Sequence, residues 1–130
     1  VEVLRRHDVD AALVAGSASS LYGFGAPPAE PRGWRAEICG PERRGTPVAE
    51  VFLRDTSLST SGTGEKRCWL DGNMHAHILD PRTGWPLQSV AQVSVVTPRA
   101  LDGEVLAKAC LLNGPVWAAE RRLQTFYAAR

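Results

Sequence analysis

The segment His75–Gly84, which reads His-Ala-His-Ile-Leu-Asp-Pro-Arg-Thr-Gly, constrains this chain more than any other stretch. Its apolar residues and their alternation predict a strand over 74–79. In a strand, residues two apart lie on the same face, so His75 and His77 should share one face. Two histidines on one face also suit zinc, but no third Cys, His or carboxylate stands at a short ligand spacing.

The second half of this segment predicts a rigid turn. Pro81 fixes its own φ and lacks an N–H donor, and Gly84 accepts backbone conformations that other residues avoid. Asp80 can accept main-chain N–H bonds across the turn, and Thr83 can do so more weakly. The sequence therefore predicts that His77 is held beside a tight loop rich in N–H donors, which favours chemistry on an anion.

Length and composition are typical of one globular domain over residues 1–130, with 44% hydrophobic and 22% charged residues. A net charge of +1 gives no electrostatic basis for binding nucleic acid or an anionic membrane. No apolar run approaches the ~20 residues of a membrane-spanning helix. A helical pattern begins at Val1, so we expect the chain to be part of something longer, and its localisation stays open.

The three cysteines are widely spaced and contain no Cys-x-x-Cys pair, which is typical of neither a disulfide framework nor a zinc site. We expect all three to be buried as small hydrophobic residues: Cys39, Cys68 and Cys110.

The pattern of short strands and few helices, with no alternating strand–helix rhythm, predicts an α+β fold. We expect a mainly antiparallel sheet with two or three helices. A hairpin should turn at Asp71-Gly72, a strong turn dipeptide. The predicted strands cover residues 11–15, 21–24, 34–38, 49–53, 66–70, 74–79, 92–97 and 125–128.

A helix is predicted after the last Val-rich strand, with Thr97 as its N-cap and Pro98 in its first turn. Asn113-Gly114-Pro115 should end this helix, and a shorter helix should cover 116–123. The apolar spacing predicts one buried face, made of Leu101, Val105, Ala109 and Leu112.

Residues 60–66 invite comparison with a phosphate-binding P-loop, but the spacing excludes it. That loop needs Gly-x-x-x-x-Gly-Lys, and here Glu65 separates Gly64 from Lys66. We therefore exclude a P-loop nucleotide triphosphatase.

The run His77–Gly84 resembles the signature of the FAD:protein FMN transferases, the ApbE-type flavin transferases. A Thr-Ser-Gly stretch at 60–62, expected to form a turn, and the Val-rich strand with its following helix also fit that family. The resemblance extends from about Val9 to Gly114 and concerns only the C-terminal part of the family. The N-terminal half, which supplies much of the flavin pocket, has no counterpart here.

This resemblance implies that the chain binds FAD and transfers FMN to a Thr or Ser of an acceptor protein. His77 would be the catalytic general base for the acceptor hydroxyl. The resemblance further implies that the flavin nucleotide is lined by Gly16, Ser61, Gly62 and Leu79.

The sequence departs from the family pattern at three places. Ser17 and Ala18 replace part of a Gly-Gly-Asp-like turn after Gly16, and Thr63-Gly64 follows where the family often has Asp-Tyr. At the metal site, Glu104 and Lys108 stand where the family has Asp and Thr.

The altered metal site leaves two interpretations open for Mg²⁺. Glu104 would be the remaining metal ligand, but Lys108 competes with Mg²⁺ for the same negative charge. Either the metal is lost and catalysis is impaired, or Lys108 replaces the metal as a fixed cation against phosphate.

A second hypothesis belongs to a different functional class. The chain would be a non-catalytic FAD-binding protein, or a structural partner subunit related to flavin transferases. A second chain or another copy of the same chain would then complete the fold.

Overall fold

The structure is a computed structural model that describes residues 1–17, 19–41 and 47–129. The helices are α1 (Glu2–Arg6) and α2 (Ala100–Glu120). The strands are β1 (Ala12–Ala15), β2 (Ser20–Phe24), β3 (Trp34–Cys39), β4 (Pro47–Leu53), β5 (Thr56–Gly62), β6 (Arg67–Leu70), β7 (Asn73–Ala76), β8 (Ala91–Thr97) and β9 (Gln124–Ala129).

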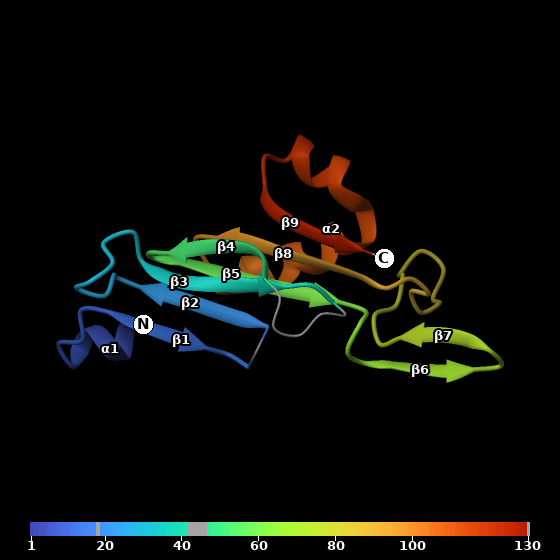
Figure 1. Cartoon of the computed structure of the whole chain (residues 1–130), viewed down its shortest axis with the longest axis horizontal. Helices are drawn as coiled ribbons and strands as arrows, with labels where there is room; N and C mark the ends of the chain where they lie inside the picture. Colours follow the sequence, from blue (N-terminus) through green and yellow to red (C-terminus); the bar gives the residue numbers. More distant parts are fainter. Residues whose placement is uncertain (18, 42–46, 130) are drawn as a thin grey trace.

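Five strands form one antiparallel sheet in the order β1-β2-β5-β8-β9, and two hairpins, β3–β4 and β6–β7, form separate ladders. In Figure 1 the β6–β7 hairpin extends away from the rest of the chain at one end, while β5 runs through the middle of the sheet. The α+β fold with a mainly antiparallel sheet, expected from the sequence, is confirmed. No helix in the described part of the chain has both the length and the apolar character needed to cross a membrane.

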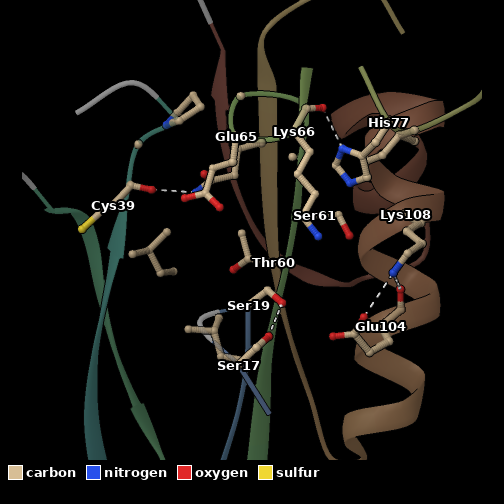
Figure 2. A pocket seen from close by; sticks show the side chains of 18 of the residues that line it. Ser17, Ser19, Cys39, Thr60, Ser61, Glu65, Lys66, His77, Glu104 and Lys108 are labelled. Carbon is tan, nitrogen blue, oxygen red and sulfur yellow. Dashed lines mark hydrogen bonds and ion pairs between the residues drawn. The ribbon is translucent and has the colours of Figure 1, made fainter. Parts of the chain in front are cut away.

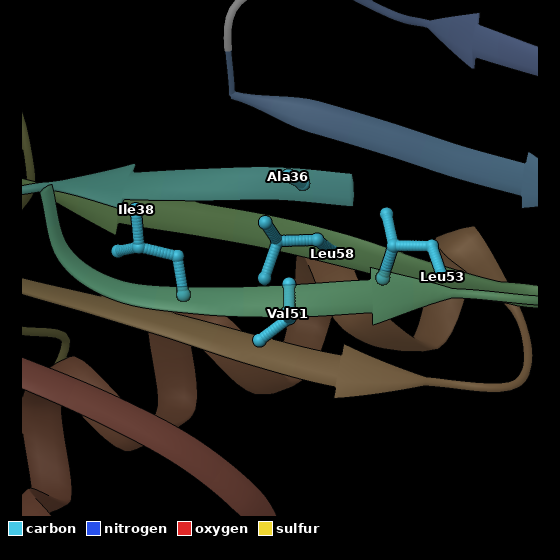
Figure 3. Packing of buried hydrophobic residues seen from close by; sticks show 5 residues of the cluster. All are labelled: Ala36, Ile38, Val51, Leu53 and Leu58. Carbon is cyan, nitrogen blue, oxygen red and sulfur yellow. The ribbon is translucent and has the colours of Figure 1, made fainter. Parts of the chain in front are cut away.

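The central sheet is covered on both faces. On β5, Leu58 packs with the β3–β4 hairpin in a buried cluster with Ala36, Ile38, Val51 and Leu53 (Figure 3). Its neighbour Ser59 points to the opposite face, because successive side chains of a strand alternate. That opposite face carries α2, and its buried cluster consists of Val93, Val95, Ala107, Cys110 and Ala118.

The buried face of α2 is made of small residues. Gly103, Ala107, Cys110 and Ala118 are buried. A Cβ on Gly103 would lie 2.6 Å from the Ser59 hydroxyl, so the helix backbone lies almost against β5. Only very small side chains fit between a helix and a sheet at this separation.

The buried helix face predicted from the sequence was therefore wrong. Leu101 and Val105 are 67% and 61% exposed, and Ala109 and Leu112 are only half-buried. Apolar periodicity identifies the most hydrophobic face of a helix. Here the helix lies so close to the sheet that the face with the smallest side chains is buried instead.

The predicted start of α2 was also wrong, whereas its predicted interruption is confirmed. Thr97 is the last residue of β8, with its hydroxyl 2.8 Å from that of Ser57 and 2.9 Å from the carbonyl of Arg99, and Arg99 is the N-cap. Gly114 has φ 83° and ψ 178° inside α2, which divides it into two segments.

Three further expectations need correction. Residues 60–62 are the end of β5 rather than a turn, because each pairs in register with β8. The strand predicted over 74–79 stops at Ala76, so His77 lies just beyond it. Cys110 is buried, but Cys68 is exposed and Cys39 only half-buried.

Candidate functional site

A cavity of about 1360 Å³ opens between the end of β3, the end of β5 and the side of α2. Figure 2 shows these three elements around it, with the side chain of Lys66 pointing toward Ser61 and with His77 and Lys108 on the helix side. The amide of Gln92 donates to the carbonyl of Cys39 at 2.7 Å and ties β8 to the end of β3. The lining residues are Ser17, Ser19, Leu21, Glu37–Pro41, Leu58, Thr60–Gly62, Gly64–Arg67, His77, Ile78, Gln92, Glu104 and Lys108.

The imidazole of His77 is oriented by the main chain. Its Nδ1 lies 3.1 Å from the carbonyl oxygen of Lys66, and the main-chain N–H of His77 donates to the same oxygen at 3.1 Å. Because a carbonyl only accepts, Nδ1 must carry the proton in this hydrogen bond. The lone pair of the neutral ring is then on Nε2, which leaves this nitrogen able to accept a proton.

The turn after His77 has the predicted construction. Arg82 donates its main-chain N–H to Oδ1 of Asp80 at 2.9 Å, Trp85 donates to the Thr83 hydroxyl at 3.2 Å, and Gly84 has φ 74°. The Arg82 side chain binds the Asp80 carboxylate and lowers the pKa of that carboxyl.

This turn does not line the cavity. Instead, Arg82 donates to the carbonyl of Leu112 in α2 at 3.3 Å. The turn therefore connects the chain next to His77 to α2. Its main-chain N–H groups donate to acceptors within the turn itself.

Four of the six residues nominated by the sequence come together at the cavity: His77, Ser61, Gly62 and Glu104. Gly16 and Leu79 do not line it. Gly16 donates to the carbonyl of Ser20 at 2.8 Å and closes the turn between β1 and β2. Leu79 is 55% exposed and pairs with Pro86.

The β1–β2 turn instead presents hydroxyl groups to the cavity. Ser17 and Ser19 line it, and their Oγ atoms lie 3.3 Å apart. Ala18, the second of the two residues that replace the family's turn, lies outside the described residues.

The cavity combines charge with an apolar wall. The chain has only two lysines, Lys66 and Lys108, and both line this cavity. Among the described residues, no carboxylate forms an ion pair with Lys66. The apolar part of the lining comes from Leu21, Ile38, Leu58 and Ile78. Such a surface suits a ligand with both an anionic group and an aromatic or aliphatic body.

The sequence nominated Gly16 from the turn before β2, but neither Ser17 nor Ser19 from the same turn, and it did not nominate Lys66. Lys66 was considered only as part of a P-loop, which its spacing excludes. The available signal was the scarcity of lysine, since one of the two stands eleven residues before His77.

Glu104 is held by two partners. The hydroxyl of Ser20 in β2 donates to Oε1, and Nζ of Lys108 lies 3.1 Å from Oε2. The hydrogen bond from Ser20 lowers the pKa of Glu104, and the hydrogen bond and charge of Lys108 lower it further, against the opposing effect of burial. The carboxylate is thus kept ionised, and each of its oxygens accepts one hydrogen bond.

These surroundings do not fit Mg²⁺. Each oxygen of Glu104 already accepts a hydrogen bond, and one of the donors is an ammonium that repels a divalent cation. Across residues 1–17, 19–41 and 47–129, no three His, Cys, Asp or Glu residues gather closely enough to hold a metal ion.

Comparison with known proteins gives a consistent result. The family model of the ApbE family matches residues 1–125. The FAD:protein FMN transferase of Treponema pallidum is 34% identical over 123 residues, which cover 88% of this chain and 34% of that protein. The enzyme of the same name from Escherichia coli K12 is 33% identical over 89 residues, or 67% of this chain and 25% of that protein.

Solved structures agree. The crystal structure of the Pseudomonas stutzeri flavinyl transferase ApbE in its apo form matches 99% of this chain and 41% of its own, with a TM-score of 0.75 and 28% identity. The ApbE protein of Thermotoga maritima, at 21% identity, shares the fold with a TM-score of 0.80 over 95% of this chain and 42% of its own.

The chain spans about a third of the length of the first of these curated relatives and a quarter of the second. The matched region includes His77, which lies just beyond β7, and the helix α2, which carries Glu104. The family match and the shared fold together show that this chain belongs to the ApbE family.

Proposed function

We propose that this chain binds FAD in the cavity beside His77 and transfers its FMN moiety to the hydroxyl of a Thr or Ser in an acceptor protein. One observation carries the proposal: an imidazole with its Nδ1 anchored to the Lys66 carbonyl stands on the same cavity as both lysines of the chain. The family relatives named FAD:protein FMN transferase support the same assignment.

The cavity has the size and lining for a dinucleotide. Most small-molecule pockets measure roughly 300–1,000 Å³, and this one is larger. The diphosphate of FAD would lie near the two lysines of the cavity, Lys66 and Lys108, and near the hydroxyls of Ser17 and Ser19. The apolar wall at Ile38 and Leu58 would contact the ring system.

The transfer step balances without a further reactant. The acceptor hydroxyl oxygen attacks the phosphorus of the FMN half, and a phosphoester bond forms. The P–O bond within the diphosphate breaks, and AMP departs with the electron pair. Nε2 of His77 takes the proton from the hydroxyl, so the products are the FMN-modified acceptor and AMP.

Two measurements test this proposal. Titration of FAD with the chain should change the flavin fluorescence in a saturable way. Incubation with FAD and a Thr-containing acceptor peptide should then add the mass of one FMN, less water, to the peptide and release AMP. The proposal would be overturned if no fluorescence change and no mass increase were observed under any condition, including with Mg²⁺ present.

A second candidate function is FAD binding without transfer, as a partner subunit. The pairing of Glu104 with Lys108 favours it, because the carboxylate expected to hold a metal is engaged by an ammonium. A second chain or another copy of this one would then complete the active site, with the exposed Trp69 and Trp85 available for contact. Saturable FAD binding with no FMN transfer, together with a dimeric mass in light scattering, would support this alternative.

A further inference from the structure

The Glu104–Lys108 pair differs from an ordinary exposed pair of residues four apart on a helix. Its carboxylate also accepts from Ser20, which lies on β2 and is 84 residues away in the sequence. The side chain of Glu104 is 38% exposed and that of Lys108 is 55% exposed. An isolated surface pair moves freely and stabilises little, whereas this one is anchored to the sheet.

Lys108 is fixed at two of its three N–H groups. Its Nζ donates to Oε2 of Glu104 at 3.1 Å and to the main-chain carbonyl of Glu104 at 3.2 Å. An ammonium has three donors and no acceptor, so one donor remains for a ligand. Figure 2 shows Lys108 at the helix side of the cavity, below His77.

From this geometry we propose that Lys108, held by Glu104 and Ser20, is the built-in cation of a diphosphate subsite that requires no divalent metal. The inference rests on the proposed function, because it names the group that holds the diphosphate of its substrate. It follows from the poor fit of Mg²⁺ at Glu104 and from the ammonium beside that carboxylate.

Three carboxylates line the cavity: Glu37, Glu65 and Glu104. Glu37 is paired with Arg35 at 2.6 Å, and Glu104 is engaged by Lys108, so these two carboxylates repel an incoming anion less than free ones would. Lys66 supplies a second ammonium on the same cavity. A lysine ammonium acts on phosphate as a compact point charge with donors that can rotate.

The direct test uses inorganic pyrophosphate as the probe and isothermal titration calorimetry on the whole chain. In EDTA the unmodified chain should bind pyrophosphate, and Lys108→Met should weaken binding at least about tenfold through loss of one charge-assisted contact. Lys108→Arg, which keeps the charge, should recover part of the affinity. Arg99→Met removes a cation from the start of the same helix, away from the cavity, and should leave binding unchanged.

Three results would overturn the inference. The first is pyrophosphate binding that appears only when Mg²⁺ replaces EDTA. The second is equal binding by Lys108→Met and the unmodified chain, and the third is no binding with EDTA or with Mg²⁺. Circular dichroism of each variant checks that it is folded.

A second measurement needs no variant. Because the chain has only two lysines, acetylation of each can be followed by peptide mass spectrometry. Pyrophosphate in EDTA should slow acetylation of Lys108. Protection of Lys66 alone, or of neither lysine, would contradict the assignment.

The two proposals fail separately. If pyrophosphate binds through Lys108 but FAD produces no fluorescence change, the subsite stands and the flavin function is overturned. If FAD binds and Lys108→Met binds it equally well in EDTA, the flavin function stands and the subsite is overturned.

Discussion

Two hydrogen bonds join His77 to the carbonyl oxygen of Lys66, one from the main-chain N–H and one from Nδ1, each at 3.1 Å. A single acceptor thus fixes both the backbone and the ring of His77. Since Lys66 itself lines the cavity, the residue that orients the imidazole also contributes a positive charge to the same site.

Replacing His77 by Ala should reduce FMN transfer by about 10²–10⁴-fold, the usual contribution of a general base. FAD binding should change much less, because the diphosphate is assigned to the lysines. The rate of peptide labelling and the fluorescence titration separate the two effects. His75→Ala is the matched control, since His75 does not line the cavity; equal loss of transfer in both variants would contradict the role of His77.

Glu104 should make stability depend on acid pH. The pKa of Glu104 in the folded chain is lowered from 4.5. The ionised carboxylate therefore contributes to the free energy of unfolding above pH 4.5, and this contribution is lost as the pH falls through the pKa of the folded chain. Its partial exposure limits the contribution to about 0.5 kcal/mol. Glu104→Gln should therefore be less stable than the unmodified chain near pH 6, and the difference should be smaller near pH 3.

Urea unfolding at the two pH values measures this difference. Glu120→Gln removes an exposed carboxylate at the end of the same helix, 3.6 Å from Arg121, and should follow the unmodified chain. A constant gap between Glu104→Gln and the unmodified chain at every pH would show that the effect is not ionic.

Tyr127 should make stability depend on alkaline pH. Burial raises the pKa of its hydroxyl far above 10, and the hydroxyl donates to the carbonyl of Cys110 at 3.2 Å. Between the unfolded and folded pKa values only the unfolded chain ionises, so stability falls as the pH rises above about 10. Burial raises the pKa of the Cys110 thiol as well, which adds a loss of the same sign.

Tyr127→Phe should cost about 1 kcal/mol at pH 7, because the Cys110 carbonyl loses its donor. The variant should then lose less stability than the unmodified chain between pH 9 and pH 11 in urea unfolding. The only other tyrosine provides the control: Tyr22→Phe also removes a phenol hydroxyl but leaves the hydrogen bond between Tyr127 and Cys110 in place. An unchanged slope in Tyr127→Phe would refute the assignment.

Gly103→Ala should destabilise the chain by about 1–3 kcal/mol, although alanine normally favours a helix. The new Cβ would lie 2.6 Å from Oγ of Ser59 and 2.9 Å from Oγ1 of Thr97, so α2 must move away from the sheet. Adding Ser59→Ala removes the nearer atom and should recover part of the loss. Thermal unfolding of the two single variants and the double variant measures this coupling, and purely additive effects would argue against the clash.

Much of the local structure could be predicted from short-range rules. Asp71 and Gly72 both adopt positive φ, 49° and 77°, as the hairpin turn between β6 and β7 requires. The break at Gly114 and the turn after His77 likewise follow from residues that restrict or free their own backbone. These features depend on neighbours within a few residues.

The site could be predicted only in part. His77, Ser61, Gly62 and Glu104 line one cavity, but Thr60–Gly62 form strand rather than turn because β8 pairs with them. Lys66 reaches the cavity because the segment after β5 lies against the chain that follows β3. The sequence of that segment alone does not predict this long-range contact.

By itself, the sequence determined the α+β class, the family, the turn chemistry and the proximity of a histidine to a proline-stiffened bend, because backbone preferences and a contiguous signature are local properties. The tertiary structure decided which face of α2 is buried and which charges meet. The distance between helix and sheet is set by Ser59 and Gly103 together, 44 residues apart. That distance turns Leu101 outward and brings Glu104 within reach of Ser20.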